Sequence, residues 1–273
     1  SSTFAGSLTQ LGTAGVRFSE TVNLISDGDI EVKFYDPNAL IPSLEIYDNV
    51  STGAVDAGWS TSGYWGSKNS ALNLFAAVPF GPGPGEYLAW MWNGDGEKLM
   101  NELYHPVGIH GQVCGIVSPE TSGWFKEEIK DVSQMKGLKY RTVGLAADVL
   151  MEMGMSVVQL PGGEIQPAMK AGLIDAAEFN NPTSDRDFGM QDVSKDYHLA
   201  SFHQSQEFFE VTFNKKKYEA LPEELQAILK YASEAENSNF YWGNTKRYAD
   251  DLNTLQTEQG VNVHRTPDNV MAA

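Results

Sequence analysis

The sequence has a single cysteine, Cys114, among its 273 residues. This excludes an internal disulfide and also zinc sites built from four cysteines or from two cysteines and two histidines. No apolar run approaches the roughly 20 residues that a membrane helix needs, so we predict no direct membrane insertion. Basic residues are few: 19 Lys and Arg against 36 Asp and Glu give a net charge of −17. Because nucleic acids and anionic membranes attract basic surfaces, this balance argues against both as partners.

Signatures of several enzyme and metal classes are missing as well. There is no Gly-x-Ser-x-Gly, no His-Glu-x-x-His and no Gly-x-x-x-x-Gly-Lys-Ser/Thr motif. The loop at 81–85 is rich in glycine, but its two prolines lack the amide N–H groups that a phosphate needs. Five histidines show no ligand spacing, and we interpret most of them as structural or surface residues. We therefore predict no catalytic residue and no required cofactor.

Two stretches separated by 119 residues share one pattern. The first contains Gly53-Ala54-Val55-Asp56-Ala57, and the second contains Gly172-Leu173-Ile174-Asp175-Ala176. In each, an apolar run and an amphipathic helix precede a glycine that suits a left-handed helix end, and a new strand follows. Two strand–helix–strand units this far apart predict two similar α/β lobes. A cleft between such lobes is a common binding place for small ligands.

Strands and helices are expected to alternate through most of the chain, which is typical of an α/β fold. Helices are expected over 8–25, 43–51, 96–104, 145–153, 164–171 and 221–256, the last with a break near Gly243, and strands over 30–34, 55–59, 107–117, 138–142, 156–160, 176–179 and 208–213. We expect lobe I to comprise 1–112 with about 202–220, and lobe II to comprise 113–201. A long bridging helix and the C-terminal segment are expected over 221–273.

Arg141 is the most informative of five arginines. It lies near the end of a predicted strand, just before Gly144 and a helix, and ligands of open α/β sheets bind beyond the carboxyl ends of strands. A planar guanidinium can hold a carboxylate with two parallel hydrogen bonds. The alternative is a surface arginine paired with a nearby Asp or Glu, and position alone does not decide between the two.

Aromatic residues gather at comparable places in the two repeats. Tyr64 and Trp65 follow the strand of the first repeat, and Phe179, with Asn180, follows the strand of the second. We expect the ends of these two strands to face each other across the cleft. The alternative is ordinary core packing.

Several segments occur in an order and spacing that resemble one known family. They are Pro79-Phe80-Gly81, Gly123-Trp124-Phe125, Met135-Lys136-Gly137-Leu138-Lys139-Tyr140-Arg141, Gln159-Leu160-Pro161-Gly162-Gly163-Glu164-Ile165 and Ala171-Gly172-Leu173-Ile174-Asp175-Ala176-Ala177-Glu178. The chain resembles the DctP-like solute-binding proteins of tripartite ATP-independent periplasmic (TRAP) transporters, most of all the branch that binds α-keto acids and lactate. The resemblance covers nearly the whole chain, although the family's first strand and part of its C-terminal region are expected to be absent. It implies a two-lobed fold like that of type II periplasmic binding proteins.

The resemblance also implies a ligand site. Arg141 matches the arginine that pairs with the ligand carboxylate, and a cation such as Ca²⁺ or Na⁺ can lie between ligand and protein. Glu120 stands where the α-keto-acid branch has a glutamine ligand of that cation, and Gln204 stands where the family often has a glutamate. The expected ligand-binding residues are Arg141, Glu120, Phe179, Asn180, Trp65, Tyr64, Trp124 and Phe202. The expected cation-binding residues are Glu120, Glu178, Phe179, Asn180 and Gln204.

The sequence thus predicts a periplasmic binding protein that captures a 2-keto or 2-hydroxy carboxylate and delivers it to the permease subunits of a TRAP transporter. One alternative is a different ligand, either a polyol or sugar acid or an aromatic acid. Another is an enzyme on the same scaffold, with Glu120 and Glu178 as paired carboxylates, although nothing supplies a cofactor or an activated nucleophile. A third is a sensor module that presents the same cleft to a receptor.

Overall fold

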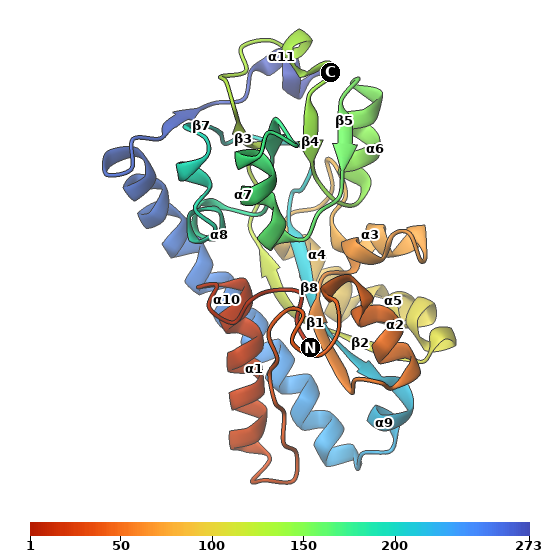
Figure 1. Cartoon of the computed structure of the whole chain (residues 1–273). Coiled ribbons are helices and arrows are strands. Elements are labelled where there is room, and N and C mark those ends of the chain that lie inside the picture. The colour runs from red at the N-terminus through yellow and green to blue at the C-terminus, as the bar shows by residue number, and fades with distance from the viewer. The chain divides into compact units, whose positions relative to one another are not determined.

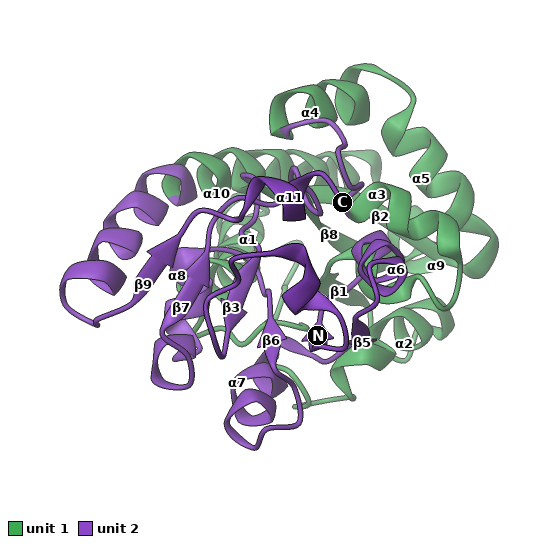
Figure 2. Ribbon diagram, turned by 90° about the horizontal axis from the view of Figure 1, so that it is seen from above, with its two compact units in different colours: residues 1–76, 84–117, 208–243 green, residues 77–83, 118–207, 244–273 purple.

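Strands from distant parts of the chain form two separate sheets in the computed structural model, which describes residues 1–273. The chain divides into two compact units, coloured green and purple in Figure 2. Unit 1 comprises Ser1–Ala76, Pro84–Val117 and Phe208–Gly243, and unit 2 comprises Ala77–Gly83, Ser118–Glu207 and Asn244–Ala273. Helices and strands mix in both units, which confirms the predicted α/β class. The lobe borders expected from the sequence stay a prediction.

Unit 1 is built on a three-stranded sheet in the order β1-β8-β2. Its strands are β1 (Ala57–Ser60), β2 (Ile109–Val117) and β8 (Glu207–Asn214), which begins at the last residue of unit 2. Its helices include α1 (Leu11–Ile25), α2 (Ile46–Thr52), α3 (Asn73–Ala76), α4 (Pro84–Asn93), α5 (Gly96–Tyr104) and α9 (Lys215–Glu219). Its 3-10 turns are η1 (Ser43–Glu45), η2 (Ser62–Trp65), η3 (Ser70–Leu72) and η4 (His105–Val107). The central strand β8 is buried along its whole length, so its aromatic and β-branched residues form the middle of the core.

The longest helix, α10 (Glu223–Thr257), has 35 residues and stands out in blue in Figure 1. It is continuous through Gly243, so the predicted break is wrong. A glycine in a helix interior costs only about 1 kcal/mol, which the rest of a helix this long outweighs. The first half of α10 lies beside α1, where Arg17 and Glu236 form an ion pair of 2.5 Å. No helix of the structure combines the length and the apolar character that crossing a membrane requires.

The strand expected over 30–34 is not formed. The main-chain N–H and C=O of Val32 bond to the Asn23 side chain, at 2.6 and 2.9 Å, and not to a neighbouring strand. A cavity of about 530 Å³ is lined both by this segment and by residues of β1. The alternating apolar residues of the segment are therefore explained by the cavity that they line. The segment lacks the ladder of main-chain hydrogen bonds that defines a strand.

Unit 2 contains a six-stranded sheet in the order β5-β4-β6-β3-β7-β9. Its strands are β3 (Gly123–Phe125), β4 (Lys139–Arg141), β5 (Ser156–Val158), β6 (Ala176–Ala177), β7 (Asp196–His198) and β9 (Asn262–His264). Its helices are α6 (Leu145–Glu152), α7 (Gly162–Lys170), α8 (Pro182–Asp187), the end of α10 and α11 (Asp268–Met271), with 3-10 turns η5 (Val132–Met135) and η6 (Met190–Asp192). Strand β4 pairs in parallel with β5 on one side and β6 on the other.

The repeated pattern of the sequence is present in both units. Gly53 ends α2 with φ 78°, and Gly172 follows α7 with φ 71°, so both glycines adopt the left-handed conformation that was predicted. The strand after each glycine begins at the alanine of the Asp-Ala step, Ala57 in β1 and Ala176 in β6. The helix, the glycine and the following strand of the predicted repeat are thus confirmed in both units, whereas the strand expected before them in unit 1, over 30–34, is not formed.

Candidate functional site

The carboxyl ends of three parallel strands meet in unit 2. Strand β4 ends at Arg141, β5 is followed by Leu160, and β6 is followed by Glu178. The register places Arg141 opposite Ala177, so the side chains that follow β6 begin beside the arginine. This edge of a parallel sheet is the place where α/β proteins bind ligands.

The Arg141 side chain is buried, with 1% of it exposed. Its Nε and NH2 atoms donate to the carbonyl of Leu160, at 3.0 and 2.9 Å, and its NH1 atom donates to the carbonyl and to Oε1 of Glu178, at 3.1 and 2.9 Å. The guanidinium carbon lies 5.8 Å from the centre of the Phe179 ring. A buried, oriented guanidinium that holds one carboxylate oxygen can also bind the carboxylate of a ligand.

Glu120 lies close to this arginine cluster and is equally buried, with 2% exposed. Its main-chain N–H donates to the carbonyl of Gln204 at 3.0 Å, and its Oε1 accepts from the amide of Asn180 at 2.6 Å. Its Oε2 has no hydrogen-bond partner. Burial, followed by the charges of Glu207 and Glu178, raises the pKa of Glu120 well above its ordinary value. This carboxyl therefore calls for a positive partner to become ionised.

Other acceptors in the cluster also lack partners. Glu178 gives one oxygen to Arg141, while its Oε2 has no hydrogen bond. Gln204 donates to Glu207 at 2.6 Å, and its own Oε1 has no hydrogen bond. Buried acceptors without donors are rare in native proteins and often mark a place for a cation. The sequence-predicted residues Arg141, Glu120, Glu178, Phe179, Asn180 and Gln204 are thus brought together in unit 2.

His203 is the residue of this cluster that the sequence reasoning missed. One donor atom each of His203, Glu120 and Glu178 lies within 4.8 Å of the other two. Its Nε2 is 4.0 Å from Glu120 Oε2, too far for a hydrogen bond. Burial lowers the pKa of His203, which keeps the imidazole neutral at pH 7. Its place in the chain between Phe202 and Gln204, two predicted site residues, was the available signal.

Trp124 and Phe202 take packing positions in unit 2. The indole N–H of Trp124 donates to Asp185 at 2.9 Å, and its ring stacks on Tyr197 with centroids 4.3 Å apart. Burial raises the pKa of Asp185 to about 7, against the opposite effect of hydrogen bonds from Trp124, Tyr197 and the main chain. Phe202 stacks on Phe80 with centroids 5.0 Å apart. Trp124 supports the site by holding the start of α8, which follows Asn180 and Asn181 in the chain.

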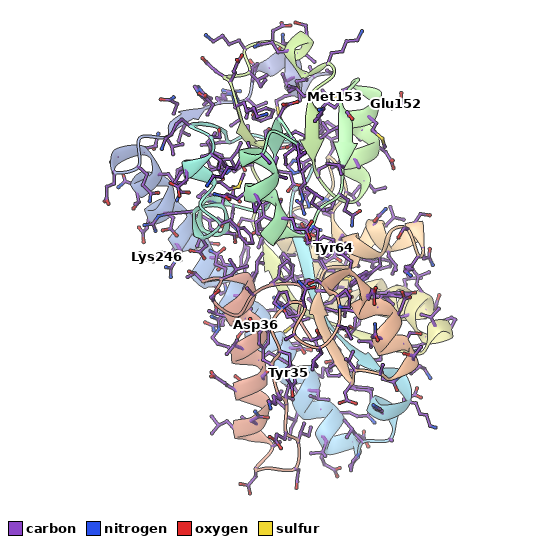
Figure 3. All side chains as sticks on the ribbon, viewed as in Figure 1. Tyr35, Asp36, Tyr64, Glu152, Met153 and Lys246 are labelled. Carbon is purple, nitrogen blue, oxygen red and sulfur yellow. The ribbon has the colours of Figure 1, made fainter.

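Tyr64 and Trp65 belong to unit 1, in the 3-10 turn η2 that follows β1; Figure 3 labels Tyr64. Both are buried, and their rings lie 6.2 Å apart. Trp65 also contacts Tyr47 at 5.9 Å. Their part in ligand binding stays a prediction.

The residues of the cluster suit a cation. Glu120, Glu178 and Gln204 offer oxygen atoms, which Ca²⁺ and Na⁺ prefer. Asn180 is already engaged with Glu120, so its amide oxygen is less available. Phe179 can contribute only its main-chain carbonyl, because its ring has no donor atom. The unpartnered oxygens of Glu120, Glu178 and Gln204 therefore fit the cation expected from the sequence.

Comparisons with known proteins show the family of this chain. The model of one protein family, described as DctP, bacterial extracellular solute-binding protein, family 7, matches residues 1–273. A monocarboxylate 2-oxoacid-binding periplasmic protein of Nostoc sp. is 33% identical over 221 residues, which are 81% of this chain and 60% of that protein. The chain thus spans 60% of the length of this relative.

Two solved structures of TRAP solute-binding proteins are very similar. The one from Bordetella bronchiseptica, with calcium and picolinate bound, has a TM-score of 0.96 and 29% identity and covers 99% of this chain and 80% of its own. The one from Pseudoalteromonas atlantica, with sodium and pyruvate bound, has a TM-score of 0.95 and 31% identity and covers 99% of this chain and 82% of its own.

Proposed function

Because the chain belongs to the DctP family of bacterial extracellular solute-binding proteins, we propose that it binds a small 2-oxo or 2-hydroxy carboxylate in the periplasm. We further propose that it delivers this acid to the permease subunits of a TRAP transporter and carries out no reaction on it. The role needs only a site that recognises the acid, binds it and releases it unchanged.

One observation carries the proposal: the buried Arg141 guanidinium at the carboxyl end of β4. Its NH1 atom is held by Glu178 Oε1 at 2.9 Å. A ligand carboxylate can take the place of this oxygen, since it offers the guanidinium the same charge and geometry. Glu178 would then turn both oxygens toward a cation.

A cation would complete the site. The 2-oxo group and the carboxylate of such an acid offer two adjacent oxygens, and Glu120, Glu178 and Gln204 offer further ones from the protein. Pyruvate with sodium and picolinate with calcium occur in the two similar structures, so a cation between acid and protein is consistent with the family. We propose that Ca²⁺ or Na⁺ supports binding here, and that no other cofactor is required.

An aromatic acid is the second candidate ligand, because the Bordetella protein holds picolinate. Picolinate carries its ring nitrogen next to the carboxylate, where pyruvate has its keto oxygen. Both acids therefore present a carboxylate to an arginine and a second donor to a cation. The ring of Phe179, next to Arg141, is a surface on which a flat aromatic acid could pack.

Isothermal titration calorimetry tests the proposal with pyruvate and picolinate as probes, each with Ca²⁺, with Na⁺ and with chelator. We expect one of them to bind in the presence of a cation. Thermal unfolding gives a second readout, since a ligand at 100 times its dissociation constant stabilises by about 2.7 kcal/mol. Binding of neither acid under any condition would refute both a small 2-oxo acid like pyruvate and an aromatic acid like picolinate as the ligand.

Arg141→Lys is the informative variant, because it keeps the charge and removes the two-pronged guanidinium. We expect at least tenfold weaker acid binding. Arg265→Lys is the matched control, since Arg265 is exposed and pairs only with Asp268 in its own segment. Equal affinities of the two variants would show that Arg141 does not hold the acid. A melting temperature near that of the parent would verify that Arg141→Lys is folded.

A further inference from the structure

Unit 1 contains a pair of histidines that the acid site does not use. His105 begins the 3-10 turn η4 and is exposed, and His110 lies in strand β2 and is half-buried. Gly108 ends η4 in the left-handed conformation, with φ 80°, which lets the chain turn back into β2. This turn brings Nε2 of His105 to 3.2 Å from Nδ1 of His110. A spacing of five residues does not reveal the contact, because it places the two side chains on one face of neither a helix nor a strand.

One ring of the pair is fixed and the other can rotate. The His110 ring stacks on the Tyr218 ring of α9, with centroids 4.1 Å apart and planes at 16°. All three residues of η4 are exposed, so the His105 ring can rotate without displacing core side chains. The pair thus offers one preset ligand and one that can adjust to an ion.

The distance between the two nitrogens fits one shared metal ion. An imidazole nitrogen binds Zn²⁺ at about 2.1 Å, so two such nitrogens are about 3.0 Å apart at a right angle and about 3.4 Å apart at the tetrahedral angle. The observed 3.2 Å lies between these values. Without an ion, the two rings share a hydrogen bond. Metal binding requires that the His105 ring rotates its Nε2 lone pair toward the ion and carries its proton on Nδ1 instead.

Gln112 can select the tautomer of His110 that a metal requires. Its amide nitrogen lies 3.5 Å from His110 Nε2 and 3.0 Å from the Tyr218 hydroxyl, and its amide oxygen lies 3.2 Å from the Ser233 hydroxyl. A half-turn of the amide exchanges the two atoms and keeps every partner, because the Ser233 hydroxyl donates to the Leu229 carbonyl at 2.9 Å and can accept from the amide N–H. His110 Nε2–H then donates to the amide oxygen, and the lone pair is on Nδ1, toward the other histidine. Histidines that bind metals are commonly oriented by such a bond from their second nitrogen.

The charges beside the pair do not repel a cation. Lys215 and Glu219 of α9 are the charged residues that act on both rings. They form an ion pair of 2.7 Å, so their opposite effects on a bound ion largely cancel.

We propose that His105 and His110 bind a divalent transition metal ion of the class that prefers imidazole, namely Zn²⁺, Ni²⁺ or Cu²⁺, at the surface of unit 1. Water molecules complete its coordination. The site is built from residues of unit 1 only and does not depend on the proposed function. Ca²⁺ and Na⁺ prefer oxygen ligands and therefore do not compete for two imidazoles.

Calorimetric titration with Cu²⁺, the divalent ion that nitrogen ligands bind most tightly, tests the proposal. At pH 7.5, above the ordinary histidine pKa of about 6.5, free imidazoles are neutral. Excess Ca²⁺ is present to occupy the oxygen atoms of the acid site in unit 2. His105→Gln should weaken the tightest Cu²⁺ binding at least tenfold.

His264→Gln is the matched control, because it removes an imidazole from unit 2 instead, and it should change this Cu²⁺ affinity less than threefold. Equal affinities of the parent and His105→Gln, or equal losses in the two variants, would overturn the proposal.

A spectroscopic measurement identifies the ligands directly. Pulsed electron paramagnetic resonance of the parent with one equivalent of Cu²⁺ should show coupling to two imidazoles. His110→Phe keeps a flat ring against Tyr218 and should lose this double coupling. Coupling to fewer than two imidazoles in the parent would overturn the proposal even if a variant failed to fold. Double coupling that persists in His110→Phe would overturn it as well.

Failure of this inference and failure of the proposed function are distinguishable. His105→Gln should bind pyruvate with Ca²⁺ as the parent does. If the parent binds Cu²⁺ through two imidazoles that include His105, but binds neither pyruvate nor picolinate, the metal site stands and the ligand class is refuted. If the acids bind and Cu²⁺ affinity does not depend on His105, the binding protein stands and the metal site is refuted.

Discussion

Arg141 and Glu178 are buried together, and each is the charged partner of the other. Removing one charge leaves its neighbour without compensation in the interior of unit 2. We therefore expect Arg141→Ala to lower the free energy of unfolding by about 3–5 kcal/mol. Urea denaturation of the parent and the variant measures this loss.

A double variant separates the ion pair from the packing around it. Arg141→Met with Glu178→Gln removes both charges and keeps similar volumes, so it should lose less than half of what Arg141→Ala loses. Arg265→Ala is the control, because its pair with Asp268 is exposed, and it should leave the urea midpoint unchanged. A double variant as unstable as Arg141→Ala would show that the loss is due to packing and not to an unpaired charge.

Single residues of the site could be predicted to different degrees. Arg141 was found because a strand end and a family-like motif both pointed to it. The contact between Glu120 and Asn180 joins positions 60 residues apart, and nothing in the local sequence encodes it. His203 was missed because only the spacing between histidines was considered. Its neighbours in the cluster are glutamates of two distant segments.

At the scale of the elements, two glycines are expected to respond to alanine in opposite ways. Gly172 has φ 71° after α7, and its added methyl would meet only the end of the Lys126 side chain at 4.0 Å. Gly172→Ala should therefore destabilise through backbone strain alone, by about 1–2 kcal/mol. Gly243 lies inside α10 with open space around it, so Gly243→Ala should stabilise by about 0.5–1 kcal/mol.

Urea unfolding of the two variants and the parent, in the same buffer, measures both changes in the free energy of unfolding. A loss of stability in Gly243→Ala would show that α10 does not adopt regular helix geometry at this position. No loss in Gly172→Ala would show that the turn after α7 does not need a left-handed residue.

The elements that could be predicted are those with a long pattern or a clear end. Helix α5 was expected over 96–104 and is found over the same residues, because an amphipathic repeat defines it. Strands β3, β7 and β9 have three residues each and were not predicted, whereas β4 and β5 are equally short and were predicted. The segment 30–34 shows the opposite failure, since its apolar pattern is present and its partner strand is not.

At the scale of the whole molecule, buried titratable groups act on stability in opposite directions. Burial raises the pKa of Glu210 in unit 1 and of Asp185 in unit 2 to about 7. These carboxyls stabilise the folded state at low pH, and that contribution is lost as the pH rises through 7. Burial lowers the pKa of His110 and His198 to about 4, so these histidines destabilise the folded state as the pH falls below their ordinary value. The free energy of unfolding of the whole protein therefore changes less with pH than the contribution of any single group.

Glu210 can be isolated from this balance by comparison with Glu210→Gln. The carboxyl is fully buried and accepts a hydrogen bond from the Tyr104 hydroxyl at 2.7 Å, a bond that a glutamine oxygen can also accept. Between pH 4.5 and 8 the parent must give up the proton that its buried carboxyl retains, whereas the variant has no proton to lose. The stability of Glu210→Gln relative to the parent should thus rise by about 3 kcal/mol over this range.

The measurement is a series of urea titrations of the parent and the variant at half-unit steps of pH. The difference between the two free energies of unfolding is free of the contributions of the histidines and Asp185, because both proteins contain these residues. Glu258→Gln, at an exposed position just after α10, provides the matched control for the loss of one carboxyl. A constant difference between Glu210→Gln and the parent would mean that Glu210 is ionised in the folded protein at pH 4.5. Burial would then have to be offset by a positive partner in unit 1 stronger than the hydrogen bonds of Tyr104 and Trp65.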